Sequence, residues 1–141
     1  MGISKGKGQD LVEFAIVLPI LAFIIFMIFD LGRAVYYFSA VTNAAREGAR
    51  YGVVDPTNTN KIIDTACHFS TGLDQDCPSS PGVGIQVSLI DEDGFTNKYE
   101  IIKVIVSYDF EPVTPGAGLL LGLNQGQSFK LSSQSLMRIE N

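Results

Sequence analysis

The sequence predicts an α+β fold in which a long N-terminal helix packs against a small three-stranded antiparallel sheet. An uninterrupted apolar stretch, Phe14 to Phe29, lies near the N-terminus, and helical periodicity continues beyond it to about residue 53. Later in the chain the apolar spacing changes to a period of two, which is typical of strands. Three such segments form a stable sheet when a helix covers one face.

With 141 residues, the chain is long enough for one membrane segment and one small domain. We expect a leader at residues 1–8, the long helix at residues 9–53 and an extracytoplasmic α+β domain at residues 54–141. The net charge is −5 and basic residues are not clustered. This charge distribution argues against a nucleic-acid partner.

The apolar stretch predicts a membrane-spanning helix. It holds 16 residues and reaches spanning length if the helix continues to Phe38, since a bilayer core requires about 20 apolar residues. We therefore expect a membrane segment at about residues 14–38. Asp30 and Arg33 interrupt it, but their i, i+3 spacing lets them neutralise each other on one helix face.

The flanking residues predict the orientation of this helix. Lys5 and Lys7 precede the apolar stretch, which places the N-terminus in the cytoplasm and most of the chain outside. A cleaved secretory signal fits poorly, because the stretch is too long and no good small-residue cleavage site follows it. Within the helix, Pro19 is expected to kink or loosen one turn.

Glu13 is the unusual residue of the stretch. Two interpretations are open from spacing alone. The carboxylate either lies at the headgroup level, where it also favours the helix N-terminus, or it has a charged partner, as polar residues in membrane helices usually do.

The string Gly8-Gln-Asp-Leu-Val-Glu-Phe-Ala-Ile-Val-Leu-Pro19, followed by Phe29-Asp-Leu-Gly-Arg33, resembles the TadE-like family of pilin-type proteins from tight-adherence (Tad/Flp) pilus systems. Its first part also resembles the prepilin signal of type IV pilins. The resemblance implies a pilin-like fold and cleavage by a membrane prepilin peptidase between Gly8 and Gln9. It further implies that Gln9, Glu13, Phe14 and Pro19 serve assembly, with Glu13 pairing with the new amine of Gln9 on a neighbouring subunit.

The resemblance implies a structural pilin, or a minor pilin or pseudopilin, that assembles through its N-terminal helix. The alternative is an uncleaved single-pass membrane component of the pilus or secretion assembly machinery. The expected partners are the same chain or other pilins, the prepilin peptidase and the pilus assembly platform. The precursor is expected in the cytoplasmic membrane, and the mature chain in a surface filament or on the extracytoplasmic face.

Cys67 and Cys77 are the only cysteines. In an exported domain an even pair indicates a disulfide, here closing a loop of about ten residues. The alternative is a metal site with the adjacent His68, although a fourth ligand and the usual zinc spacing are missing. We expect the disulfide.

The remaining elements follow from periodicity. Small residues at Val41, Ala44, Ala45, Gly48 and Gly52 form a stripe on the long helix, most of which we expect to pack on the chain's own outer domain. A short helix is expected at residues 61–69. Strands are expected over Val83 to Leu89, Tyr99 to Phe110 and Ser128 to Ile139, with Ile102, Val104, Val106, Tyr108 and Phe110 facing inward.

Two loops hold the remaining candidate sites. Asp91, Glu92 and Asp93 form a weak candidate Ca²⁺ site, but Asp-Gly is also a hairpin-turn sequence. The Gly-rich segment 116–123 holds four leucines, which cover the chain's own core, a neighbouring subunit or the outer leaflet. One histidine and no phosphate-binding loop leave little for catalysis. We expect neither an enzyme nor a bound cofactor.

Overall fold

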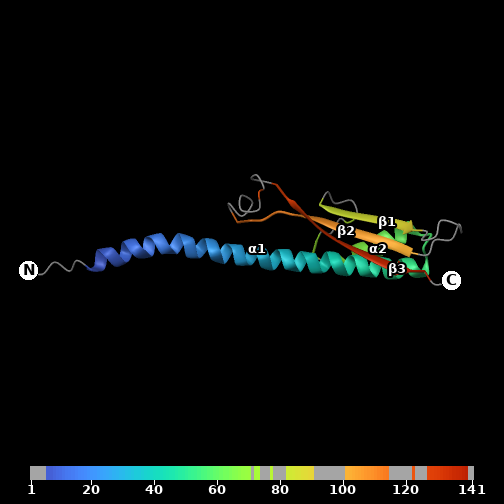
Figure 1. Ribbon diagram of the computed structural model, residues 1–141, viewed down its shortest axis with the longest axis horizontal. Helices are drawn as coiled ribbons and strands as arrows, with labels where there is room; N and C mark the ends of the chain where they lie inside the picture. Colours follow the sequence, from blue (N-terminus) through green and yellow to red (C-terminus); the bar gives the residue numbers. More distant parts are fainter. Residues whose placement is uncertain are drawn as a thin grey trace, which may run out of the picture. The chain divides into compact units, whose positions relative to one another are not determined.

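The computed structural model describes residues 6–70, 72–73, 77, 82–90, 101–114, 122 and 127–139. In this part of the chain the order of elements is α1 (Gly6–Val54), α2 (Thr59–Phe69), β1 (Val83–Ile90), β2 (Ile101–Phe110) and β3 (Phe129–Arg138). The three strands are antiparallel and β2 lies between β1 and β3 (Figure 1). The predicted α+β architecture, a long helix with a three-stranded sheet, is confirmed.

Helix α1 is longer than predicted and contains 49 residues. It begins at Gly6, three residues before the predicted start, and ends at Val54, just before Asp55 and Pro56. A residue that precedes proline disfavours the helical conformation, which explains this end. The helix passes through Pro19 without a break, although proline has no N–H to donate to the carbonyl one turn earlier.

The chain forms two compact units. One comprises Met1–Arg33 with Pro112–Gln127, and the other comprises Ala34–Glu111 with Ser128–Asn141. Helix α1 contributes its first half to the former and its second half to the latter. The second unit contains α2, the sheet and the hydrophobic core.

The core of the second unit is built on the inward face of the sheet. Ile102, Val104, Val106 and Phe110 of β2 are buried and Tyr108 is half-buried, as the alternation predicts. The register places Val104 between Val87 of β1 and Ser135 of β3. The central strand therefore supplies most of the large buried side chains.

The stripe of small residues on α1 packs against this core. Val41, Ala44, Ala45, Gly48 and Gly52 are all buried. A Cβ atom added at Gly48 would lie 3.0 Å from Cβ of Ala66 in α2 and 3.3 Å from Cγ1 of Val104. One added at Gly52 would overlap Cδ1 of Ile102. The stripe thus lets α1 approach both α2 and β2 closely, and its use lies within the chain, as expected.

An aromatic cluster adjoins the stripe one turn before Val41. The Tyr37 ring lies 4.9 Å from that of Tyr108 and 5.8 Å from that of Phe110, measured between centroids. Phe110 in turn lies 5.0 Å from Phe129 at the start of β3. Offset and tilted aromatic pairs at these distances stabilise beyond their buried area. The cluster therefore ties α1 to the end of β2 and the start of β3.

The predicted disulfide joins Cys67 of α2 to Cys77, with Cα atoms 5.6 Å apart. Next to it, Ser70 ends α2: its hydroxyl and its backbone N–H both donate to the carbonyl of Cys67, at 2.6 and 3.0 Å. Because both sulfurs are covalently bonded, they are not thiolate ligands, and the alternative of a metal site with His68 is wrong.

Removing the disulfide should destabilise the second unit without affecting membrane insertion. We expect Cys67→Ser/Cys77→Ser to lower the free energy of unfolding by about 2–3 kcal/mol, because the closed loop restricts the unfolded chain. Thermal unfolding of the full chain in detergent measures this, and membrane fractionation measures insertion. As a control, a reducing agent should lower the stability of the parent to that of the double variant and leave the variant unchanged. Equal stability of parent and variant would contradict the prediction.

Candidate functional site

The predicted cleavage and assembly residues all lie in the first turns of α1. Because the helix begins at Gly6, the bond between Gly8 and Gln9 falls inside its first turn. Gln9 and Glu13 are four residues apart and share one helix face. Both are exposed, as are Phe14 and Pro19. Among the described residues, Glu13 makes no hydrogen bond or ion pair, so its carboxylate is available to a group from outside the chain.

An apolar surface surrounds the first half of α1. The described side chains at least 49% exposed include Leu11, Val12, Phe14, Ile16, Val17, Leu18, Ile20, Leu21, Ile24, Phe26, Ile28 and Phe29. They extend around most of the helix rather than along one stripe, with Ala22, Phe23 and Met27 half-buried. Such a wide apolar surface is typical of a helix buried in lipid or among other helices. By length and composition α1 can cross a membrane, and its most apolar stretch is not buried within the protein.

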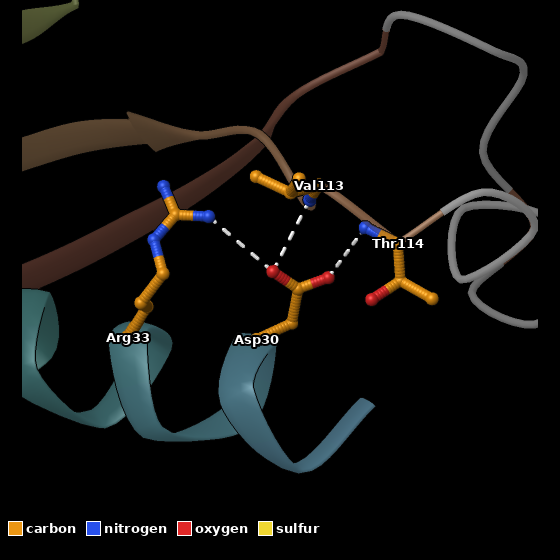
Figure 2. Close-up of polar contacts among 4 residues, drawn as sticks. All are labelled: Asp30, Arg33, Val113 and Thr114. Carbon is orange, nitrogen blue, oxygen red and sulfur yellow. Dashed lines mark hydrogen bonds and ion pairs between the residues drawn. The ribbon is translucent and has the colours of Figure 1, made fainter. Parts of the chain in front are cut away.

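This apolar surface is interrupted at Asp30, whose carboxylate is buried (Figure 2), although Leu31, Val35 and Phe38 beyond it are also exposed. The side chain points from α1 toward the segment that follows β2 and accepts two backbone hydrogen bonds from it. The N–H of Val113 donates to Oδ1 at 3.2 Å, and the N–H of Thr114 donates to Oδ2 at 2.7 Å. Both carboxylate oxygens are therefore used, and the segment is held to the helix at this point.

Arg33 completes the site from the next turn of α1. Its Nη1 lies 3.3 Å from Oδ1 of Asp30, the oxygen that also accepts from Val113 (Figure 2). The guanidinium group is partly exposed, whereas the carboxylate is not. The predicted pairing of Asp30 with Arg33 is present, but sequence reasoning missed the two backbone donors. A buried carboxylate with charge-assisted hydrogen bonds on both oxygens is a strong positional constraint.

The other candidate sites contribute no described chemistry. Asp91, Glu92 and Asp93 lie outside the described residues, and so does the leucine-rich segment 116–123 apart from Gly122. Within the described part of the chain, no group of three or more histidine, cysteine or carboxylate side chains could hold a metal ion.

Residues 8–50 match the family model for the TadE-like protein. The match lies entirely within α1 and covers less than a third of the chain. It includes the candidate cleavage site, Glu13, and the pair formed by Asp30 and Arg33. The resemblance of this segment to the TadE-like family is thus confirmed. No curated protein and no solved structure matches the chain.

Replacement of Asp30 should release the segment that follows β2. Asn in place of Asp30 keeps one acceptor oxygen but turns an NH₂ group toward the other backbone donor, so we expect a loss of about 1–3 kcal/mol. Hydrogen exchange at the amides of Val113 and Thr114 measures the release directly and should accelerate by about tenfold or more.

The matched control for Asp30→Asn is Glu47→Gln on the same helix. Glu47 also pairs with an arginine three residues later, Arg50, at 4.0 Å, but that pair is exposed. Exposed pairs contribute little to stability, so exchange at residues 113 and 114 should not change. Unchanged exchange in Asp30→Asn would show that the carboxylate does not hold the segment.

Proposed function

Because α1 carries the TadE-like sequence of Tad pilus proteins, we propose that this chain is a pilin-type subunit of such a system, acting as a structural pilin or as a minor pilin or pseudopilin. The precursor is anchored in the cytoplasmic membrane by α1, and the mature chain is built into a surface filament through the same helix. The strongest support is that the family match falls on a helix whose first half exposes apolar side chains on most sides.

The first step is removal of the leader by a prepilin peptidase at the bond between Gly8 and Gln9. The first backbone N–H groups of a helix have no partners within it, and helix ends open at little cost in free energy. Gly8 weakens this turn further, since a glycine costs about 1 kcal/mol relative to alanine in a helix. The bond is therefore available to the peptidase although it lies within α1.

The second step is assembly, in which apolar helices leave lipid by packing against one another. Charges in such a core need partners. The amine freed at Gln9 and the carboxylate of Glu13 on a neighbouring subunit have opposite charge, and pairing them offsets the cost of burying both. The outer α+β unit then lies on the outside of the filament.

The location and mass of the native protein test the proposal. A pilin-type subunit is recovered in sheared surface filaments as a chain that begins at Gln9. A chain that remains in the membrane fraction and still begins at Met1 is instead the uncleaved single-pass component of the assembly machinery. Intact mass spectrometry of the two fractions separates these outcomes.

Processing should depend on the glycine at the cleavage site. We expect Gly8→Ala to block or strongly slow maturation, because the peptidase must accommodate a tight backbone at this point. Intact mass of the membrane-bound chain is the measurement. Gly6→Ala, which makes the same change two residues earlier, is the control and should be processed normally. Normal processing of Gly8→Ala would contradict the prediction.

Assembly should depend on the charge of Glu13. Both Glu13→Ala and Glu13→Gln remove a charge that is costly in lipid, so the precursor should insert at least as well as the parent. Filament recovery should fall sharply, because the neighbouring amine would be buried without its partner, a loss of about 3–5 kcal/mol. The amount of sheared filament per cell is the measurement, with the membrane level of the processed chain as reference.

The matched control for Glu13→Gln is Asp10→Asn, which removes an exposed carboxylate one turn earlier on the same helix. This variant should assemble normally. Normal recovery for Glu13→Gln, with normal processing, would show that Glu13 is an interfacial residue and that the proposed pairing is wrong.

A further inference from the structure

From the contacts of Asp30, we infer that the outer boundary of the bilayer lies at Phe29, so that hydrocarbon covers residues 11–29 of α1 and ends one turn before Arg33. The segment that follows β2 then lies on the outer surface of the membrane. This inference rests on the proposed insertion of α1 and adds the depth at which the helix is inserted. It shortens the span expected from hydropathy, residues 14–38, at its outer end.

The irregular backbone of residues 111–114 indicates the depth of Asp30. These residues belong to neither a helix nor a strand. Two of their N–H groups are satisfied by Asp30, while Glu111 is an exposed residue with an ionisable side chain. Irregular backbone exposed to lipid does not occur in the hydrocarbon region, because its polar groups would lack partners. Asp30, to which this backbone is bound, therefore lies outside the hydrocarbon.

The part of the apolar helix that precedes Asp30 is long enough to cross a bilayer by itself. Residues 11–29 form 19 helical residues, which span about 29 Å at 1.5 Å per residue. The hydrocarbon core of a bilayer is about 30 Å thick. The helix thus crosses the bilayer without any contribution from residues beyond Asp30. Counting inward from Phe29 places Glu13 just inside the cytoplasmic boundary, within reach of the headgroups.

Apolar residues that are similarly exposed within the protein have different surroundings under this placement. Ile28 and Leu31 are each 62% exposed and Val35 is 66% exposed within the protein. Only Ile28 is covered by lipid under this placement. Leu31 and Val35 lie in the aqueous phase, and so does Val113, which is 73% exposed beside the Asp30 carboxylate.

Cysteine labelling tests this placement in the full-length protein. Ile28→Cys, Leu31→Cys, Val35→Cys and Val113→Cys are each introduced separately, and open membrane sheets containing the unassembled protein are treated with a membrane-impermeant maleimide. Both membrane faces are then accessible, so the orientation of the chain does not affect the result. Cys67 and Cys77 are bonded to each other and do not react. Labelling after denaturation in SDS gives the total for each variant.

The reactive species is the thiolate, which does not form in hydrocarbon. We expect the variants at residues 31, 35 and 113 to react about tenfold or more faster than Ile28→Cys. Protection of Leu31→Cys and Val35→Cys equal to that of Ile28→Cys would overturn the boundary while leaving membrane insertion intact. Protection of Val113→Cys would show that the segment is not in water and would also overturn it. Rapid labelling of Ile28→Cys together with the others would show that α1 is not inserted, and both proposals would fail.

Discussion

Close approach between α1 and the β2 strand is the contact on which the second compact unit, Ala34–Glu111 with Ser128–Asn141, depends. Apart from Val41, the helix contributes alanine and glycine to the core, whereas the sheet and α2 contribute the larger side chains Ile62, Ile102, Val104 and Val106. A Cβ at Gly48 would stand 3.0 Å from Ala66, so the helix surface is already within contact distance. Interiors are packed as densely as organic crystals. The sequence of the helix in this region is therefore restricted by volume rather than by hydrophobicity alone.

The side chains of α1 before Asp30 differ in size and exposure from those in the core. There most of its side chains are large, apolar and exposed, and the described residues form no core that receives them. A helix with this surface is stable only if lipid or other helices cover it. The size of the side chains along α1 therefore follows from what surrounds each part of the helix. Small residues face the protein core, and large apolar residues lie where the protein leaves the helix uncovered. Asp30, with its two backbone donors, lies at the change from one composition to the other.

Periodicity in the sequence was sufficient to predict the elements and the core. The alternation over residues 101–110 identified the buried residues of β2, and the stripe from Val41 to Gly52 identified the buried face of α1. The start of α1 was harder to place, because Gly6 and Gly8 argue against a helix and nothing local forces one to begin. The disulfide was predictable because only one pairing of two cysteines exists.

The contacts of Asp30 were not predictable in the same way. Its partners are backbone N–H groups 83 and 84 residues away along the chain. Because every residue except proline has a backbone N–H, the amino-acid sequence does not reveal which of them donates. The visible partner was Arg33, because i, i+3 spacing on a helix is a local pattern. What the sequence does contain is a carboxylate that interrupts an apolar helix. Such a residue must find donors somewhere in the fold, since a buried charge without partners is strongly destabilising.

Glu13 and Asp30 are both carboxylates on the apolar half of α1, but their surroundings differ in a way that bears on function. Asp30 is satisfied within the chain, by two backbone donors and an arginine, and is buried. Glu13 is exposed, and no described residue bonds to its side chain.

A satisfied carboxylate fixes a structure that is already complete, whereas one without a partner can be satisfied by water, by headgroups or by another molecule. If the surrounding lipid is replaced by neighbouring helices, water and headgroups are removed together, and only a donor from another chain remains. The proposed pairing with the amine at Gln9 follows from that change of surroundings, because the same event that buries Glu13 also brings the free amine of a second copy beside it.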